Sequence, residues 1–134
     1  VFAYDYGDSS GFTPAMKMYT LGHSFIPGGT HAGGLRYHGA SPIVSAIINQ
    51  GLAETAVVKQ REVFEAAITF TKCEGILPAP ESAHAIKVAI DEALKAKEEG
   101  VSKTILFNLF TPHYSHYSCN CVDCKIMVHH NPSC

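Results

Sequence analysis

Several features that would indicate a common class of protein are missing from this sequence. It has no tryptophan, and no run approaches the roughly 18 apolar residues that a membrane-spanning helix needs. Its 10 basic and 12 acidic residues give a formal net charge of −2 and form no basic stripe, which argues against nucleic acid as the main partner. No charged-then-apolar leader follows Val1. These absences predict a soluble, cytoplasmic chain, and the missing initiator methionine indicates a piece of a longer protein.

Cysteine is scarce over most of the chain. Cys73 stands alone, and the other four cysteines lie in the tail. An odd total that is clustered in this way does not form a disulfide framework for a whole domain. Three tail cysteines and one tail histidine could instead bind zinc, although their C-x-C-x-x-C spacing lacks the usual paired form. A small metal-binding module therefore stays an alternative, with ligands drawn from Cys119, Cys121, Cys124, His113, His116, His129 and His130.

The sequence also lacks the P-loop, G-x-G-x-x-G, H-E-x-x-H and G-x-S-x-G signatures. What it has is 134 residues, 46% hydrophobic and 16% charged, which is enough for one domain with a substantial core. Residues 1–40 are rich in turn-forming residues, with a short helix expected over 15–22. The tail, 111–134, has no clear periodicity, so we expect two regions: residues 1–110, and an irregular Cys/His-rich tail over 111–134.

The middle of the chain shows clearer periodicity. Helices are predicted over 41–51, with Ser41 as N-cap and Pro42 at the first position, and over 61–75 and 82–100, each ending at glycine. Strands are predicted over 54–60 and 103–110. This alternation of strands and helices favours an α/β fold, a parallel sheet flanked by helices. Since ligands bind at the carboxyl ends of such strands, a site should border the end of the 103–110 strand.

Two segments are candidates for a site. "HAGGLRYHG", residues 31–39, combines glycines that allow close backbone approach with Arg36, which can bind a carboxylate, and two histidines; the alternative is a tight structural loop with its histidines in solvent. "LPAPESAH" places Glu81 at a helix start, where an acid is favourable by about 0.3–1 kcal/mol, or else aims it into a cleft. His84 is expected to pack or cap.

Three longer stretches of the sequence indicate more than spacing and composition do. "YDYGDSSGFTPAMKMYTLGHSFIPGGTHAGGLRYHG", "EVFEAAITFTKCEGILPAPESAHAIKVAIDEALKAKEEG" and "KTILFNL" resemble the tryptophan synthase beta family, and its divergent second type best. The resemblance covers residues 4–109 and follows the family order. It implies part of a fold type II pyridoxal-phosphate enzyme, a lyase with its cofactor between two α/β domains. The reaction it implies is β-replacement, in which L-serine and indole give L-tryptophan.

The resemblance also assigns roles to residues. It implies that the loop over the amino-acid substrate includes Gly33, Gly34, Arg36, Tyr37 and His38. Glu81 matches a family glutamate beside the cofactor, which makes it the catalytic and cofactor-binding candidate. Backbone carbonyls around Tyr37 and Gly39 would lie near a monovalent-cation site. An alpha-chain partner is left open.

Some family features are missing here. The Schiff-base lysine and the glycine loop for the cofactor phosphate belong to an N-terminal part that this sequence does not contain. After "ILFNL", Phe110 stands where the family has a serine that meets the cofactor ring, and Thr111 could replace that serine if the chain shifted by one residue. The abrupt change suggests a frameshifted tail, which would need no metal. We therefore expect the isolated chain to be inactive. It should also expose an apolar face and, as a result, dimerise or aggregate. The alternative is that the chain is a non-catalytic relic.

Overall fold

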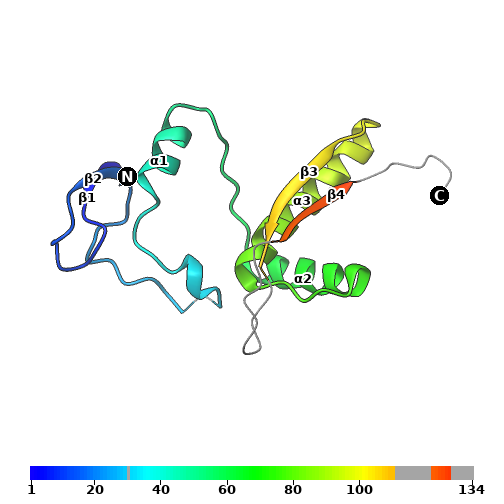
Figure 1. The fold of residues 1–134 in the computed structure, drawn as a ribbon, viewed down its shortest axis with the longest axis horizontal. Coiled ribbons are helices and arrows are strands. Elements are labelled where there is room, and N and C mark those ends of the chain that lie inside the picture. Colours follow the sequence, from blue (N-terminus) through cyan, green and yellow to red (C-terminus); the bar gives the residue numbers. More distant parts are fainter. Residues whose placement is uncertain (30, 111–121, 128–134) are drawn as a thin grey trace. The chain divides into compact units, whose positions relative to one another are not determined.

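The structure is a computed structural model that describes residues 1–29 and 31–110 and the backbone of 122–127 (Figure 1). The chain divides into two units, Val1–Val57 (unit 1) and Val58–Cys134 (unit 2). The units are described one at a time below.

Unit 1 is built on a small antiparallel hairpin. Strand β1 (Phe2–Asp5) pairs with β2 (Met16–Tyr19), so that Phe2 faces Tyr19 across the ladder. The helix predicted over 15–22 is therefore wrong. Met18 is buried while its neighbours in β2 are exposed, and this alternation is that of a half-buried strand.

The rest of unit 1 consists of loops and two short helices. The single 3-10 turn η1 (Gly33–Leu35) and helix α1 (Pro42–Asn49) follow the hairpin. Helix α1 begins at Pro42 as predicted, although the Ser41 side chain makes no capping hydrogen bond. It packs against β2, where the fully buried Ser45 hydroxyl accepts a hydrogen bond from the Tyr19 N–H at 3.0 Å.

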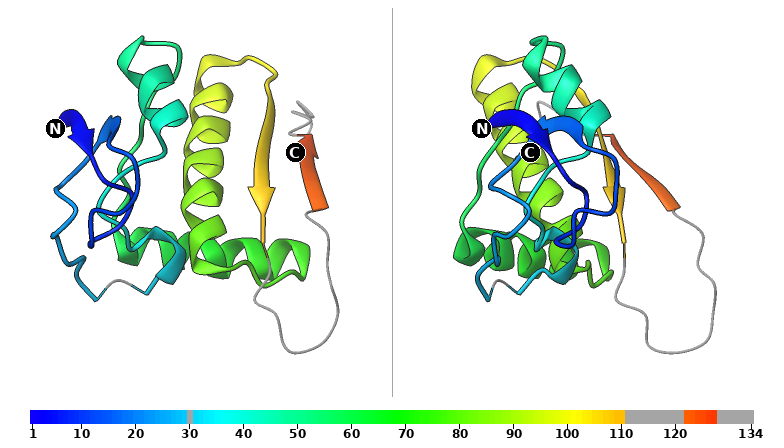
Figure 2. Two further views of the ribbon diagram at one scale, coloured as in Figure 1. Left: turned by 60° about the vertical axis from the view of Figure 1, so that its left-hand side comes forward. Right: turned by 90° about the vertical axis from the view of Figure 1, so that its left-hand side faces the viewer.

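Unit 2 contains two longer helices and a second hairpin. Helices α2 (Gln60–Glu74) and α3 (Pro80–Glu99) confirm the predicted helices, and each ends at a glycine in the left-handed region, at φ +70° for Gly75 and +66° for Gly100. Strand β3 (Thr104–Leu109) confirms the predicted strand, and it runs alongside α3 in the opposite direction (Figure 2). It pairs antiparallel with β4 (Val122–Met127).

The apolar core of unit 2 lies where its two helices meet β3. Phe70 of α2, Ile86 of α3, and Phe107 and Leu109 of β3 are all buried there. The Phe70 and Phe107 rings meet edge to face with centroids 6.1 Å apart. A second buried cluster on the same helices is made of Val63, Ala67 and Ala83.

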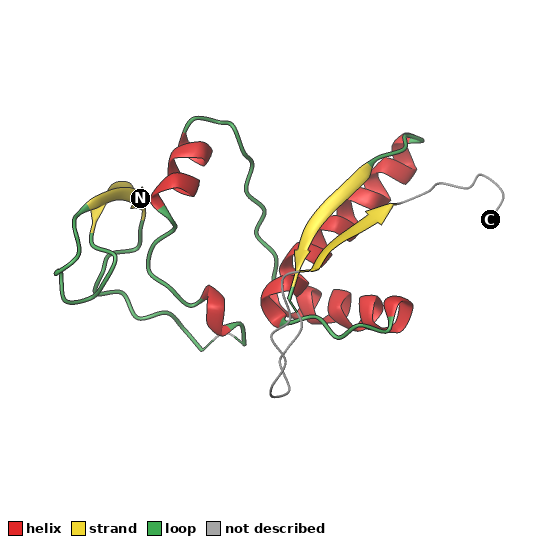
Figure 3. Ribbon diagram, in the orientation of Figure 1, coloured by secondary structure: helices red, strands yellow, loops and turns green. Residues whose placement is uncertain are grey.

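The sheets differ from the expected parallel one. Both sheets of the described residues are antiparallel pairs (Figure 3), and 54–60 forms no strand, with Val57 96% exposed. An extended segment becomes a strand only beside a partner, and the described chain places none beside 54–60. The strand β4 lies within the tail that we expected to be irregular, where it pairs with the otherwise open edge of β3.

Candidate functional site

The five predicted substrate-binding residues share one segment of unit 1. Gly33 and Gly34 lie in η1, and Arg36, Tyr37 and His38 follow directly after it. The turn is closed by a hydrogen bond of 2.9 Å from the Leu35 N–H to the carbonyl of Ala32, which is buried. The side chains of Arg36 and Tyr37 are exposed. The structure thus presents Arg36 and Tyr37 to solvent, on a backbone that is anchored at its base, whereas His38 is half-buried.

The exit of this loop is bonded to strand β2. The Leu21 N–H donates to the His38 carbonyl at 2.7 Å, and the Ala40 N–H donates to the Tyr19 carbonyl at 2.9 Å. Between these bonds Gly39 approaches the hairpin so closely that an added Cβ would lie 2.8 Å from the Met18 sulfur. A side chain at this position would therefore require the buried Met18 side chain to shift.

Arg36 is the cation of the loop. Within the described residues, its guanidinium donates one long hydrogen bond, 3.4 Å from Nη2 to the Pro27 carbonyl. Guanidinium carries five donors in a planar fork that suits a carboxylate. The geometry therefore leaves Arg36 able to bind an anionic group from solvent.

A buried carboxylate underlies the loop, and the sequence analysis gave it no role. Asp5, 7% exposed at the end of β1, accepts hydrogen bonds from the Thr20 hydroxyl, from the Tyr6 N–H at 2.8 Å and from the His23 Nδ1 at 2.8 Å. The Thr20 hydroxyl above all, with Tyr6 and His23, outweighs desolvation and lowers the pKa of Asp5 to about 2. Asp5 is therefore ionised at neutral pH.

Two histidines contact Tyr6, one at its ring and one at its backbone carbonyl. The His23 ring meets the Tyr6 ring edge to face at 5.3 Å, and the His38 Nε2 donates to the Tyr6 carbonyl at 2.8 Å. Carboxylate and carbonyl oxygens only accept hydrogen bonds. His23 therefore holds a proton on Nδ1 and His38 holds one on Nε2, which links the loop to the end of β1. No local pattern could have predicted this, because the partners lie 18 and 32 residues apart.

Glu81 lies in unit 2, in the first turn of α3 and partly buried. Its neighbours fasten the start of α3 to the end of β3: the Phe110 N–H donates to the buried Ser82 hydroxyl, and the Ala79 N–H donates to the Phe110 carbonyl, both at 2.7 Å. Glu81 is therefore beside the carboxyl end of β3, the usual position of ligands in α/β folds. His84 is half-buried and donates from Nδ1 to the Pro80 carbonyl at 2.7 Å, one turn earlier in the same helix, and the start of α3 has no side-chain capping hydrogen bond.

Other predicted residues fall beyond this description. Thr111 lies outside the described residues, as do Cys119 and Cys121, and only the backbone of Cys124 is described. Across 1–29 and 31–110, no three His, Cys, Asp or Glu side chains are grouped as a metal site would require. In the same part of the chain, no helix has the length and apolar character to cross a membrane.

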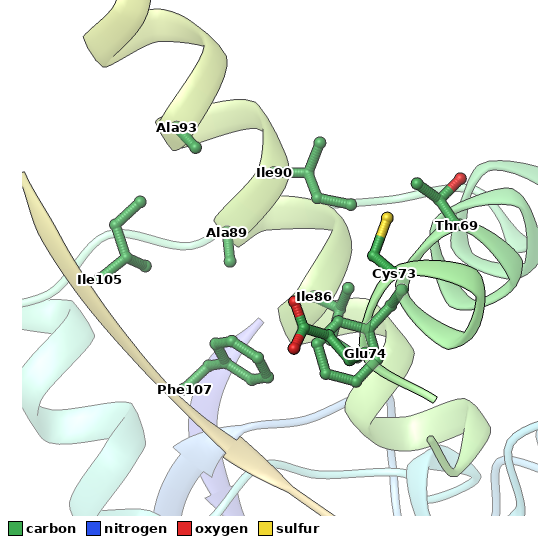
Figure 4. A pocket seen from close by; sticks show the side chains of 10 residues that line it. Thr69, Cys73, Glu74, Ile86, Ala89, Ile90, Ala93, Ile105 and Phe107 are labelled. Carbon is green, nitrogen blue, oxygen red and sulfur yellow. The ribbon is translucent and has the colours of Figure 1, made fainter. Parts of the chain in front are cut away.

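An apolar hollow of about 210 Å³ lies on unit 2 where α2, α3 and β3 meet (Figure 4). Ile90 and Ala93 of α3, Ile105 and Phe107 of β3, and Cys73 of α2 contribute to its wall. None of the predicted site residues lines it. It is an extension of the apolar core rather than part of the candidate site.

Comparison with known proteins shows which family this segment is related to. The chain is 64% identical over 108 residues to tryptophan synthase beta chain 2 of Aquifex aeolicus. It is 62% identical over 109 residues to tryptophan synthase beta chain of Thermococcus onnurineus, and 59% identical over 108 residues to beta chain 2 of Methanosarcina acetivorans. Most of this chain is homologous to a segment of the tryptophan synthase beta chain.

The tryptophan synthase beta chain match covers 81% of this chain in all three comparisons. The chain spans about a quarter of the length of these relatives, 24–25% in each case. No protein-family model matches it. The resemblance stated from the quoted stretches is thus confirmed for a segment of the tryptophan synthase beta chain.

Proposed function

We propose that this chain is the C-terminal portion of a pyridoxal-phosphate-dependent tryptophan synthase beta-like protein, which makes L-tryptophan from L-serine and indole. The observation that carries the proposal is the 57–64% identity to tryptophan synthase beta chains over four fifths of the chain. The exposed, anchored loop and a carboxylate at the end of β3 support it. In the complete protein, β3 would join a parallel sheet of the fold type II enzymes.

In this proposal, each group of predicted residues has its own task in the complete protein. Arg36, Tyr37 and His38, with the backbone of Gly33 and Gly34, bind and orient the amino-acid substrate. Glu81 holds or moves a proton at the end of β3. Pyridoxal phosphate, when bound, supplies an electron sink for the β-replacement. Thr111 would contact the cofactor ring, and carbonyls near Tyr37 and Gly39 would bind a monovalent cation.

The described residues do not by themselves make a cofactor site. A lysine that forms a Schiff base is activated by a desolvated or cationic environment. Every described lysine is at least partly exposed, and the two least exposed are ion-paired, Lys87 with Asp91 and Lys103 with Glu99. We infer that an N-terminal portion, such as the relatives possess, supplies the lysine and the phosphate-binding loop, and that the isolated chain is inactive.

The surface of unit 2 supports the need for a partner. Leu106, Phe110 and Ile68 are 55–66% exposed, and contact with another chain would remove this apolar surface from water. We propose that this surface binds the N-terminal portion that the relatives possess. Without that portion, it should bind a second copy of this chain. We propose further that the complete protein binds an alpha chain and that it is cytoplasmic.

Reconstitution tests this function. The chain is mixed with a separately produced N-terminal portion of the Aquifex aeolicus relative and pyridoxal phosphate, and tryptophan formed from serine and indole is measured. We expect activity from the mixture and none from either part. Glu81→Gln should reduce the rate by about 10²–10⁴-fold, the usual contribution of a positioned acid or base.

Glu98→Gln is the matched control, since Glu98 is an exposed carboxylate at the far end of the same helix. It should leave the rate unchanged. If the two portions form a stable complex that binds the cofactor and makes no tryptophan, the proposed function is wrong for this chain.

A further inference from the structure

We infer that Asp5 is a positioning residue for the loop at 33–39: acting through Thr20, Tyr6 and His23, it holds the loop exit against β2 and fixes the orientation of His38. The significance of the loop for substrate rests on the proposed function. The positioning itself does not, because it is a property of unit 1.

The first connection runs through Thr20. The Thr20 hydroxyl donates to Asp5 Oδ2 and accepts a hydrogen bond from the Gly22 N–H at 2.9 Å. Thr20 lies between the two residues that bond the loop exit, Tyr19 through its carbonyl and Leu21 through its N–H. Holding Thr20 in place therefore also holds its neighbours Tyr19 and Leu21, to which the loop exit is hydrogen-bonded.

The second connection runs through Tyr6. Its N–H donates to Asp5 Oδ1, and its carbonyl accepts the hydrogen bond from His38. The same Asp5 oxygen accepts the bond from His23, whose ring supports the Tyr6 ring. The orientation of the His38 side chain thus depends on a residue that Asp5 holds in place from two directions.

The arrangement uses both oxygens of a carboxylate. Asp5 accepts three hydrogen bonds, two on Oδ1 and one on Oδ2, and only 7% of the residue is exposed. Asparagine has one acceptor oxygen and places two donors where the other oxygen was. In Asp5→Asn the amide oxygen can still accept from Tyr6 and His23, but the NH2 group then faces the Thr20 hydroxyl, which can no longer donate to this residue, and the charge that strengthens all three bonds is lost.

Asp8 offers a matched control on the same hairpin. It also accepts hydrogen bonds, from the Gly11 N–H at 2.8 Å, from the Ser10 hydroxyl at 3.0 Å and from Thr13 at 3.4 Å. All of these close the turn between β1 and β2, and none involves the 33–39 loop. Asp8→Asn thus makes the same chemical change three residues away without touching the proposed connection.

The experiment measures amide hydrogen exchange in the full chain by NMR. In Asp5→Asn we expect the Leu21 and Ala40 amides, which form the loop-exit bonds, to exchange at least about tenfold faster. In Asp8→Asn their exchange should be unchanged. Loss of the carboxylate charge weakens the bond from His23 Nδ1, so nitrogen-15 shifts of the imidazoles should show a smaller share of the Nδ1–H form of His23 in Asp5→Asn and no change in Asp8→Asn, a difference that a general loss of stability would not produce. Equal exchange in both variants would overturn the inference.

A second pair of variants decides the matter if Asp5→Asn unfolds the hairpin, as loss of the β1–β2 ladder amides would show. Thr20→Val removes the hydroxyl that bonds Asp5, and Thr20→Ser keeps it. Faster exchange at Leu21 and Ala40 in the valine variant, with rescue in the serine variant, supports the positioning role; identical exchange in the two rejects it.

The reconstituted enzyme separates this inference from the proposed function. If both hold, Asp5→Asn raises KM for serine more than it lowers kcat, because the loop binds substrate from a less ordered state. If exchange changes as expected and no reconstituted activity exists, the positioning role stands and the function fails. If activity is present and unaffected while exchange is unchanged, only the positioning role fails.

Discussion

The two units bury different kinds of side chain. Among its described residues, unit 1 buries Asp5, Thr20 and Ser45 together with two apolar residues, Met18 and Ala32. Unit 2 buries a single polar side chain among its described residues, Ser82, and otherwise an apolar set. That set is Val63, Ala66, Ala67, Phe70, Ala83, Ile86, Ala96, Phe107 and Leu109.

This difference determines what each unit can position. Apolar packing is non-directional and stabilises a fold in proportion to the area that it buries. Buried hydrogen bonds to a carboxylate are directional and fix one arrangement of their donors. The polar interior of unit 1 therefore suits a loop whose orientation matters, and the apolar core of unit 2 suits a helix that carries one glutamate at the end of a strand.

The largest expected effect is a cavity in unit 2. Ile86 is 1% exposed at the centre of the core, so Ile86→Ala should reduce the free energy of unfolding of this unit by about 2–5 kcal/mol. Amide exchange measured residue by residue should show the loss in α2, α3 and β3. The hydrogen-bonded amides of unit 1, such as Leu21, should be nearly unaffected.

Leu94→Ala is the control for this cavity, because Leu94 lies on the same helix with 54% of its surface exposed. It should change stability by less than about 0.5 kcal/mol, as surface substitutions usually do. Equal losses from the two variants would mean that unit 2 has no well-packed core.

A smaller effect is expected from a hydroxyl of unit 1. Ser45→Ala leaves the Tyr19 N–H without its acceptor, at a cost of about 1–3 kcal/mol. Ser41→Ala, four residues earlier, should cost less than the usual ~1 kcal/mol of an N-cap, since its side chain makes no capping bond. Urea unfolding followed by NMR compares the two. A larger loss from Ser41→Ala would contradict the assignment of Ser45 as the residue that holds α1 to β2.

Acidification should destabilise unit 1 before unit 2, without any mutation. The pKa of Asp5 is about 2 in the folded chain against an ordinary 3.8, so folding favours the ionised form. The stability that the ionised Asp5 carboxylate contributes is present above about pH 4 and is lost as the pH falls toward 2. We expect the Leu21 and Ala40 amides to lose protection in this range before those of α3, whose described core contains no buried carboxylate.

Two substitutions test the assignment of this acid effect. Asp5→Asn should remove most of the difference between the units. Desolvation opposes ionisation of Asp8, but hydrogen bonds from Ser10, Gly11 and Thr13 hold its pKa below its ordinary value. Because these bonds close only the turn between β1 and β2, Asp8→Asn should leave the acid effect at Leu21 and Ala40 unchanged. Simultaneous loss of both units on acidification, in all variants, would show that a different group governs the transition.

The same contrast explains what could be predicted from the sequence. Helices α2 and α3 were predicted because their apolar spacing and terminal glycines are local signals. The loop at 31–39 and Glu81 were found from glycine content and family resemblance. These signals, too, lie within a few consecutive residues.

The elements that were missed depend on distant partners. Four residues, Met16–Tyr19, are compatible with a helix until Phe2–Asp5 pairs with them. Residues 54–60 have strand-like composition and no strand beside them. Asp5 and His23 are 18 residues apart and meet only after the hairpin has formed, so no spacing rule connects them.

The smallest effect sharpens the comparison by showing which charges do not matter. Arg61 and Glu65 pair at 2.9 Å, one turn apart on α2, with side chains 89% and 61% exposed. Such a pair stabilises a helix by about 0.2–0.5 kcal/mol and is weakened by salt. Arg61→Ala should therefore lower the thermal midpoint of unit 2 only slightly at low salt and not measurably in 1 M NaCl, whereas the buried Asp5 network should keep its effect at both salt concentrations. If salt removed the effect of Asp5→Asn as well, Asp5 would be acting as a screened surface charge, and the polar interior of unit 1 would not be what orients the loop.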